Sequence, residues 1–64
     1  MSGAAPGTLP PLLTVGEVSA YLRISEKTVR RMIRRRDLQA FRVGGQLRVD
    51  RDSVIRLLQV GEVR

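Results

Sequence analysis

Apolar residues recur at helical spacing near the N-terminal end of this 64-residue chain. Val15, Val18 and Leu22 are spaced i, i+3 and i+7, which predicts a helix from Thr14 to about Leu22. Thr14 and Glu17 have the spacing of a capping box, and apolar residues at 13 and 18 occupy the two positions of a hydrophobic staple. The first predicted helix therefore has a well-defined start.

A second helix is predicted to begin after a three-residue connection, 23–25. Ser25 is a suitable N-cap residue, because its hydroxyl can accept a hydrogen bond from a free amide of the first turn. Val29, Met32 and Ile33 follow at i, i+3 and i+4, and form the predicted buried face. Arg36 would turn back toward that face, so we expect the helix to end near Arg35 or Arg36, since arginine is rarely buried completely.

Residues 38–49 are predicted to form a β-hairpin around Gly44 and Gly45. A two-residue loop would pair Val43 with Gln46 and would mix apolar and polar side chains on one face. A three-residue loop, 44–46, would place the apolar side chains on one face and the arginines on the other. The register of a hairpin follows the hydrophobic pattern. We therefore predict the three-residue loop, which places one set of side chains inward, Phe41, Val43, Leu47 and Val49, and one pair outward, Arg42 and Arg48.

A third helix is predicted after Asp50, which is a plausible N-cap, with Asp52 adding negative charge to its first turn. Its apolar face contains Val54, Leu57 and Leu58, and Gly61 is the expected stop. We also expect the aromatic residues, Tyr21 and Phe41, to lie in the core or at its edge. The predicted fold class is mainly α with a small β-hairpin, a winged helix-turn-helix over residues 12–60. Residues 1–11 and 61–64 are expected to be flexible tails.

Composition narrows the function. A chain of this length forms one small domain, and it contains no cysteine and no histidine, so disulfides, thiol catalysis and the usual general base are excluded. Its carboxylates are expected to act as caps rather than catalysts, so we predict no enzyme activity, no metal, no cofactor and no small-molecule ligand. No apolar run is long enough to span a bilayer and no signal peptide is recognisable, so we expect a cytoplasmic protein.

Charge then indicates a partner. Twelve Lys and Arg residues against six acidic ones give a net charge of +6, which favours a polyanion. Residues 27–36 contain no anion and several like-charge i,i+4 pairs, each costing a few tenths of a kcal/mol. In a helix-turn-helix the second helix enters the major groove, and arginine matches the edge of guanine. The alternative is a solvated basic face. The predicted DNA-contacting residues are Glu26, Lys27, Thr28, Arg30, Arg31, Arg34 and Arg35.

The hairpin supports the same interpretation. In the predicted register Arg42 and Arg48 lie directly opposite each other, which is mildly destabilising unless a phosphate lies between them or both enter a minor groove. The alternative is two exposed arginines on a solvated sheet face.

The stretch 12–58 resembles the MerR-like winged helix-turn-helix domains of the excisionase family. The resemblance rests on LTVGEVSAYL, on IS-x-x-TV-x-R-x-I and on the hairpin RVGG-x-LRV. Members include recombination directionality factors, which bend attachment-site DNA, and small transcription regulators similar to BldC. The resemblance implies a wing formed by residues Arg42, Gly44, Gly45, Gln46 and Arg48. The family often has glycine where this chain has Arg23 and Arg36.

These observations together predict a protein that binds double-stranded DNA and associates with the nucleoid. Because one small module buries limited surface, several copies on adjacent sites are expected to bind cooperatively and bend DNA. An integrase is a possible further partner. The alternative function is a protein-interaction module that uses the same basic face to bind an acidic partner, as an anti-activator would.

Overall fold

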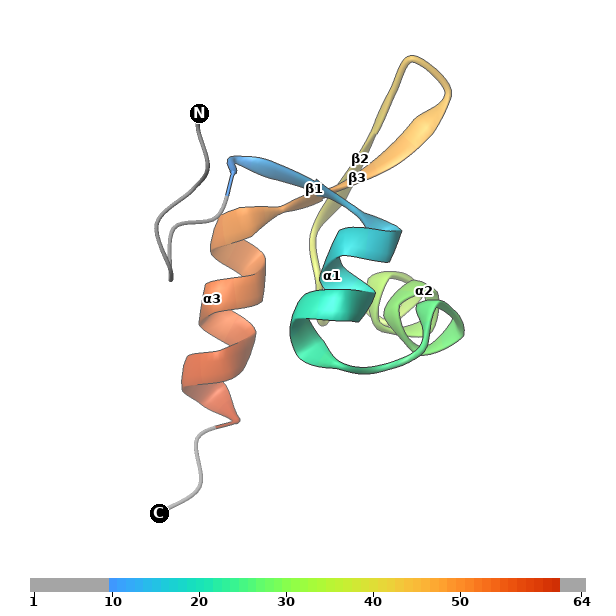
Figure 1. Cartoon of the computed structure of the whole chain (residues 1–64). Helices are drawn as coiled ribbons and strands as arrows, with labels where there is room; N and C mark the ends of the chain where they lie inside the picture. Colours follow the sequence, from blue (N-terminus) through green and yellow to red (C-terminus); the bar gives the residue numbers. More distant parts are fainter. Residues whose placement is uncertain (1–9, 62–64) are drawn as a thin grey trace.

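The computed structural model describes residues 10–61, so most of the two predicted tails lies outside the described residues. The order of elements is β1 (Leu12–Thr14), α1 (Val15–Leu22), α2 (Glu26–Arg34), β2 (Ala40–Val43), β3 (Gln46–Asp50) and α3 (Arg51–Val60). Figure 1 shows α3 at the left and α1 and α2 further right, all below the strands, and the β2–β3 hairpin projecting away from the helices. The architecture is the predicted winged helix-turn-helix.

The sheet has one strand more than the sequence predicted. Its strand order is β1-β3-β2, and both pairings are antiparallel. Leu13 of β1 lies opposite Val49 of β3, and the exposures of the two side chains are only 3% and 0%. The segment directly before α1 thus completes the sheet and anchors the wing to the helices.

The core is formed by one buried side chain or more from nearly every element. Val18 of α1, Val29 of α2 and Val54 of α3 are fully buried together with Val49 of the central strand. Leu38, in the connection between α2 and β2, is also buried, which the sequence analysis did not predict. Since the three helices share this core with Val49, they pack on the face of the sheet to which Val49 points.

The first helix begins and ends as strong local signals require. Thr14 Oγ1 accepts a hydrogen bond from the Glu17 amide at 2.9 Å, and Glu17 Oε1 accepts one from the Thr14 amide at 2.8 Å, which confirms the capping box. Arg23 follows the last turn in the left-handed conformation, with φ 60°. The backbone amide of Ile24 donates to Ser19 O at 3.1 Å and closes the turn.

The second helix also has the predicted start. Ser25 Oγ accepts a hydrogen bond from the Thr28 amide at 3.1 Å, Val29 is fully buried, and Met32 and Ile33 pack against the core. The helix ends at Arg34, close to the predicted position.

Its C-terminal end is a Schellman motif. The Asp37 amide donates to Met32 O at 2.9 Å, and the Arg36 amide donates to Ile33 O at 3.1 Å. Arg36 itself is left-handed, with φ 66°, at the position of this motif where glycine is preferred.

The predicted hairpin register is wrong. The strands pair Val43 with Gln46, Arg42 with Leu47 and Phe41 with Arg48, so the loop has two residues. Gly44 and Gly45 have φ values of 58° and 82°, the positive pair that a type I′ turn requires, and this turn matches the twist of the strands. Turn chemistry therefore decided the register, and the apolar pattern did not.

The register also corrects the positions of Phe41 and its neighbours, and the exposure of Tyr21 in α1 corrects the other aromatic residue. Ala40, rather than Phe41, lies opposite Val49 and faces the core. Phe41 and Val43 are about half exposed, at 48% and 50%, and Tyr21 is 46% exposed, so neither aromatic residue belongs to the core.

The third helix begins where predicted, but a different residue stabilises its start. Asp50 occupies the N-cap position without a side-chain capping hydrogen bond. Ser53 is buried instead; its hydroxyl donates to Asp50 O at 2.7 Å and accepts from the Gln39 amide at 3.1 Å. Val54 is buried and Leu57 packs on the core, whereas Leu58 is 47% exposed, so its predicted burial is wrong. The helix ends at Gly61.

Candidate nucleic-acid interface

The exposed face of α2 carries a high density of positive charge. The helix buries Val29, and every cation assigned to the predicted recognition helix is exposed: Lys27, Arg30, Arg31, Arg34 and Arg35. Thr28 is half-buried, and its hydroxyl forms a hydrogen bond of 2.9 Å with Ser25 Oγ. Thr28 therefore supports the N-terminal turn of the helix, while the charged residues face outward.

Few of these cations are neutralised by the protein itself. Arg30 Nη2 lies 3.3 Å from Glu26 Oε1, and Arg35 Nε lies 3.8 Å from Asp37 Oδ2. Both ion pairs are exposed, so each contributes little to stability. Within residues 10–61, the remaining three cations of α2 form no ion pair: Lys27, Arg31 and Arg34. Their charge is available to an external anion.

The hairpin presents its two arginines on opposite faces. Arg42 shares the face of Ala40, on the side of the sheet where the helices pack, whereas Arg48 lies opposite Phe41 on the other face. The predicted pairing of Arg42 with Arg48 across one phosphate is therefore wrong.

The two arginines also differ in their own contacts. Arg48 is half-buried and donates to Leu47 O at 3.1 Å and to Gln46 Oε1 at 2.8 Å. Arg42 is exposed and makes one long hydrogen bond, 3.4 Å from Nη1 to Gly45 O. Gly44, Gly45 and Gln46 form an exposed tip. Arg42 is thus the less constrained cation of the hairpin.

Two arginines beside the ends of α2 were not among the predicted contact residues. Arg23 precedes the helix and Arg36 follows it, and both are exposed and left-handed. The only signal in the sequence was the occurrence of arginine at positions where the resembling family often has glycine.

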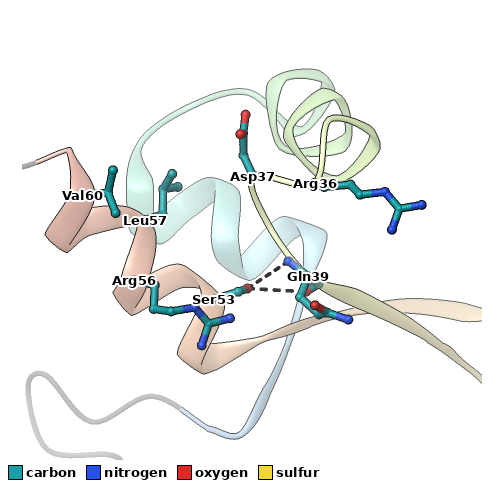
Figure 2. A pocket seen from close by; sticks show the side chains of 7 residues that line it. All are labelled: Arg36, Asp37, Gln39, Ser53, Arg56, Leu57 and Val60. Carbon is teal, nitrogen blue, oxygen red and sulfur yellow. Dashed lines mark hydrogen bonds between the residues drawn. The ribbon is translucent and has the colours of Figure 1, made fainter.

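A shallow hollow of about 350 Å³ lies between α3 and the connection from α2 to β2. Figure 2 shows that Arg56 extends toward the bonded pair of Ser53 and Gln39, while Arg36 points away from α3 and from Arg56. The two guanidinium groups do not converge, and the Ser53 hydroxyl is already occupied by backbone partners. This hollow lacks the features of a ligand site.

Other kinds of site are not apparent between residues 10 and 61. That part of the chain contains no cluster of acidic side chains suited to a metal ion. It also contains no helix whose length and apolar character would allow it to cross a membrane.

Comparisons with known proteins agree with the fold. A family model described as a helix-turn-helix domain matches residues 12–59. Two Mycobacterium tuberculosis proteins are each 44% identical to the chain over 48 residues: "Putative DNA-binding protein MT0521" of strain CDC 1551 / Oshkosh and "Putative DNA-binding protein Rv0500A" of strain ATCC 25618 / H37Rv. The match covers 75% of this chain and 62% of each relative, so the chain spans less than two thirds of their length. The chain belongs to the family of excisionase-type helix-turn-helix domains.

Proposed function

We propose that this chain binds double-stranded DNA with α2 in the major groove. The observation that carries the proposal is the face of α2 opposite Val29, where Lys27, Arg31 and Arg34 are exposed without an ion pair among the described residues. Like charges this close are unfavourable in the free protein, and a polyanion removes that cost. The names of the two relatives, both of which describe DNA-binding proteins, support the same partner.

Base recognition is assigned to the first turns of α2, which in a helix-turn-helix reach the base edges. Lys27 and Arg31 are one helical turn apart and extend from the exposed face, where each can donate to guanine O6 or N7. Glu26 accepts from Arg30 in the free protein. In the complex its carboxylate can accept from a cytosine amino group once Arg30 turns to a phosphate.

The hairpin is assigned to the adjacent backbone or minor groove. Arg42 is the cation that lies on the helix side of the sheet, so it can contact the same DNA as α2. The exposed glycines of the tip, Gly44 and Gly45, allow the backbone to approach closely. Arg48 lies on the far face and has a lesser role.

The biological role that we propose is that of a recombination directionality factor or a small transcription regulator. One module of this size makes few base contacts, so useful selectivity requires several copies on neighbouring sites. Cooperative binding of adjacent copies would then bend the DNA, and an integrase bound nearby is a compatible partner.

A competition experiment tests the proposal. Fluorescent duplex bound to the protein is challenged with three competitors: a duplex selected for tight binding, a random duplex and heparin. Arg56→Ala is the matched control variant, because it removes an exposed arginine of α3. We expect the selected duplex to compete best, and Arg31→Ala to reduce this preference while Arg56→Ala retains it. Equal competition by all three polyanions would contradict DNA recognition and would favour a module that binds an acidic protein.

A further inference from the structure

A second hollow adjoins the first, and Arg36 and Gln39 line both. Its volume is about 310 Å³, and it lies between the C-terminal end of α2 and the start of β2. Two arginines line it and no carboxylate does; the lining residues are Ile33, Arg34, Arg36, Leu38, Gln39 and Ala40. This composition suits an anion.

The strained backbone at Arg36 is a second, independent indication that its side chain has a function. Arg36 holds the left-handed position of the Schellman motif, with φ 66°, where a side chain is disfavoured and glycine is the usual residue. Strain of this kind persists at positions where the side chain has a use. Figure 2 shows that the Arg36 side chain extends away from α3 and from Arg56.

Asp37, the next residue in the chain, forms its ion pair with Arg35 and not with Arg36: its Oδ2 lies 3.8 Å from Arg35 Nε. Asp37 lines the hollow beside α3, as Arg36 also does, but it does not line this one. Within residues 10–61, neither Arg34 nor Arg36 forms an ion pair. Both guanidinium groups therefore keep their donors available to an external anion.

We infer that Arg34 and Arg36 together bind one phosphodiester group of the DNA backbone at this hollow. This inference rests on the proposed function. It adds a DNA contact located between the recognition helix and the wing. The planar fork of arginine matches two phosphate oxygens, and such contacts position the protein without reading sequence. Both side chains are exposed, so a free phosphate ion would be held weakly, whereas a DNA phosphate is already brought close by the rest of the interface.

The salt dependence of affinity tests the inference. Affinity for one duplex of about 20 base pairs is measured over a range of salt for the wild type and for Arg36→Gly, which removes the charge and relaxes the backbone. We expect the slope of log K against log salt to become shallower by up to about 0.9, and binding near 0.1 M salt to weaken by up to about tenfold, because Arg34 alone then contacts the phosphate. The loss should be the same on selected and random duplexes, because a phosphate contact carries no sequence information.

Three further variants separate this contact from other effects. Arg36→Lys keeps the charge and should keep the slope, and Arg56→Ala removes an equal charge from α3 and should also keep it. Arg36→Asn removes the charge at a position where Asn tolerates a left-handed backbone, so it should reproduce Arg36→Gly.

Two results would overturn the inference while leaving DNA binding intact. The first is a wild-type slope in both Arg36→Gly and Arg36→Asn. The second is an equal loss of slope in Arg56→Ala, which would reveal a general effect of charge. If the wild-type protein binds duplex no more tightly than it binds heparin, the proposed function is refuted, and the phosphate site with it.

Discussion

Replacing Arg23 with glycine is expected to stabilise the free protein. Arg23 has φ 60° and ψ 43°, and a non-glycine residue in this conformation costs about 1–2 kcal/mol. Its backbone amide donates to Ser19 O, and glycine retains this donor. Within residues 10–61 the Arg23 guanidinium makes no hydrogen bond or ion pair, so the substitution removes no polar contact there.

The net gain is smaller than the strain released. Glycine increases the conformational entropy of the unfolded chain, which offsets about 0.5–1 kcal/mol. A remaining stabilisation of about 0.5–1 kcal/mol raises the Tm of a domain this small by about 2–8 °C. Thermal melting followed by circular dichroism, without DNA, measures it.

Arg23→Ala is the matched control. It removes the same charge but keeps a side chain at positive φ, so its Tm should remain near that of the wild type. If Arg23→Gly lowers the Tm, the strain argument is refuted. If both variants raise it equally, relief of charge repulsion in a protein of net charge +6, and not the backbone, explains the gain.

Four other predictions concern the interface and the hairpin. If about five cations contact phosphates, log K for duplex should fall against log salt with a slope near −4 to −5, and a slope shallower than about −2 would contradict the assignment. Arg31→Ala should cost about 1–3 kcal/mol on the selected site and relax selectivity at one base, whereas Arg42→Ala should weaken selected and random duplexes alike, as measured by fluorescence anisotropy. Arg42→Ala should also weaken binding more than Arg48→Ala, and the reverse order would place the DNA on the other face of the hairpin. Gly45→Ala should reduce the free energy of unfolding, measured by chemical denaturation, by about 1–2 kcal/mol. The cost comes from the backbone, because Gly45 has φ 82° and an added Cβ would meet no atom within 4 Å. An unchanged free energy of unfolding would contradict the two-glycine turn.

The helices were predictable because their signals are local. Thr14 and Glu17 lie three residues apart, and Ser25 lies three before Thr28, so each cap is encoded within a single turn. The buried faces of α1 and α2 also follow from spacing alone, as Val18 and Val29 show.

The sheet was predicted less well because its pairing is not local. β1 is only three residues long, and Leu13 is buried by Val49, which lies 36 positions later in the chain. The hairpin register failed because Phe41 and Val43 were assumed to point inward, whereas the two glycines fixed a two-residue turn and left both residues half exposed. The structural role of Ser53 was missed because its hydroxyl accepts a hydrogen bond from the amide of Gln39, which is distant in sequence.

The basic residues of α2 were identified from sequence, and the structure confirms that they are exposed on one helix. Their proposed contacts with DNA remain a prediction. The relative placement of the arginines outside α2 could not be derived, because it depends on the hairpin register for Arg42 and Arg48 and on the helix termini for Arg23 and Arg36.

Mapping the DNA contact directly by NMR tests the central claim, that the exposed face of α2 and the helix side of the hairpin form the interface. Amide chemical shifts of the labelled protein are followed during titration with selected duplex. We predict the largest changes in residues 25–31 and 42–46, and small changes in the exposed turns of α3, where Arg56 is located. Changes centred on α3, or on the hairpin face that carries Phe41 and Arg48, would contradict the account.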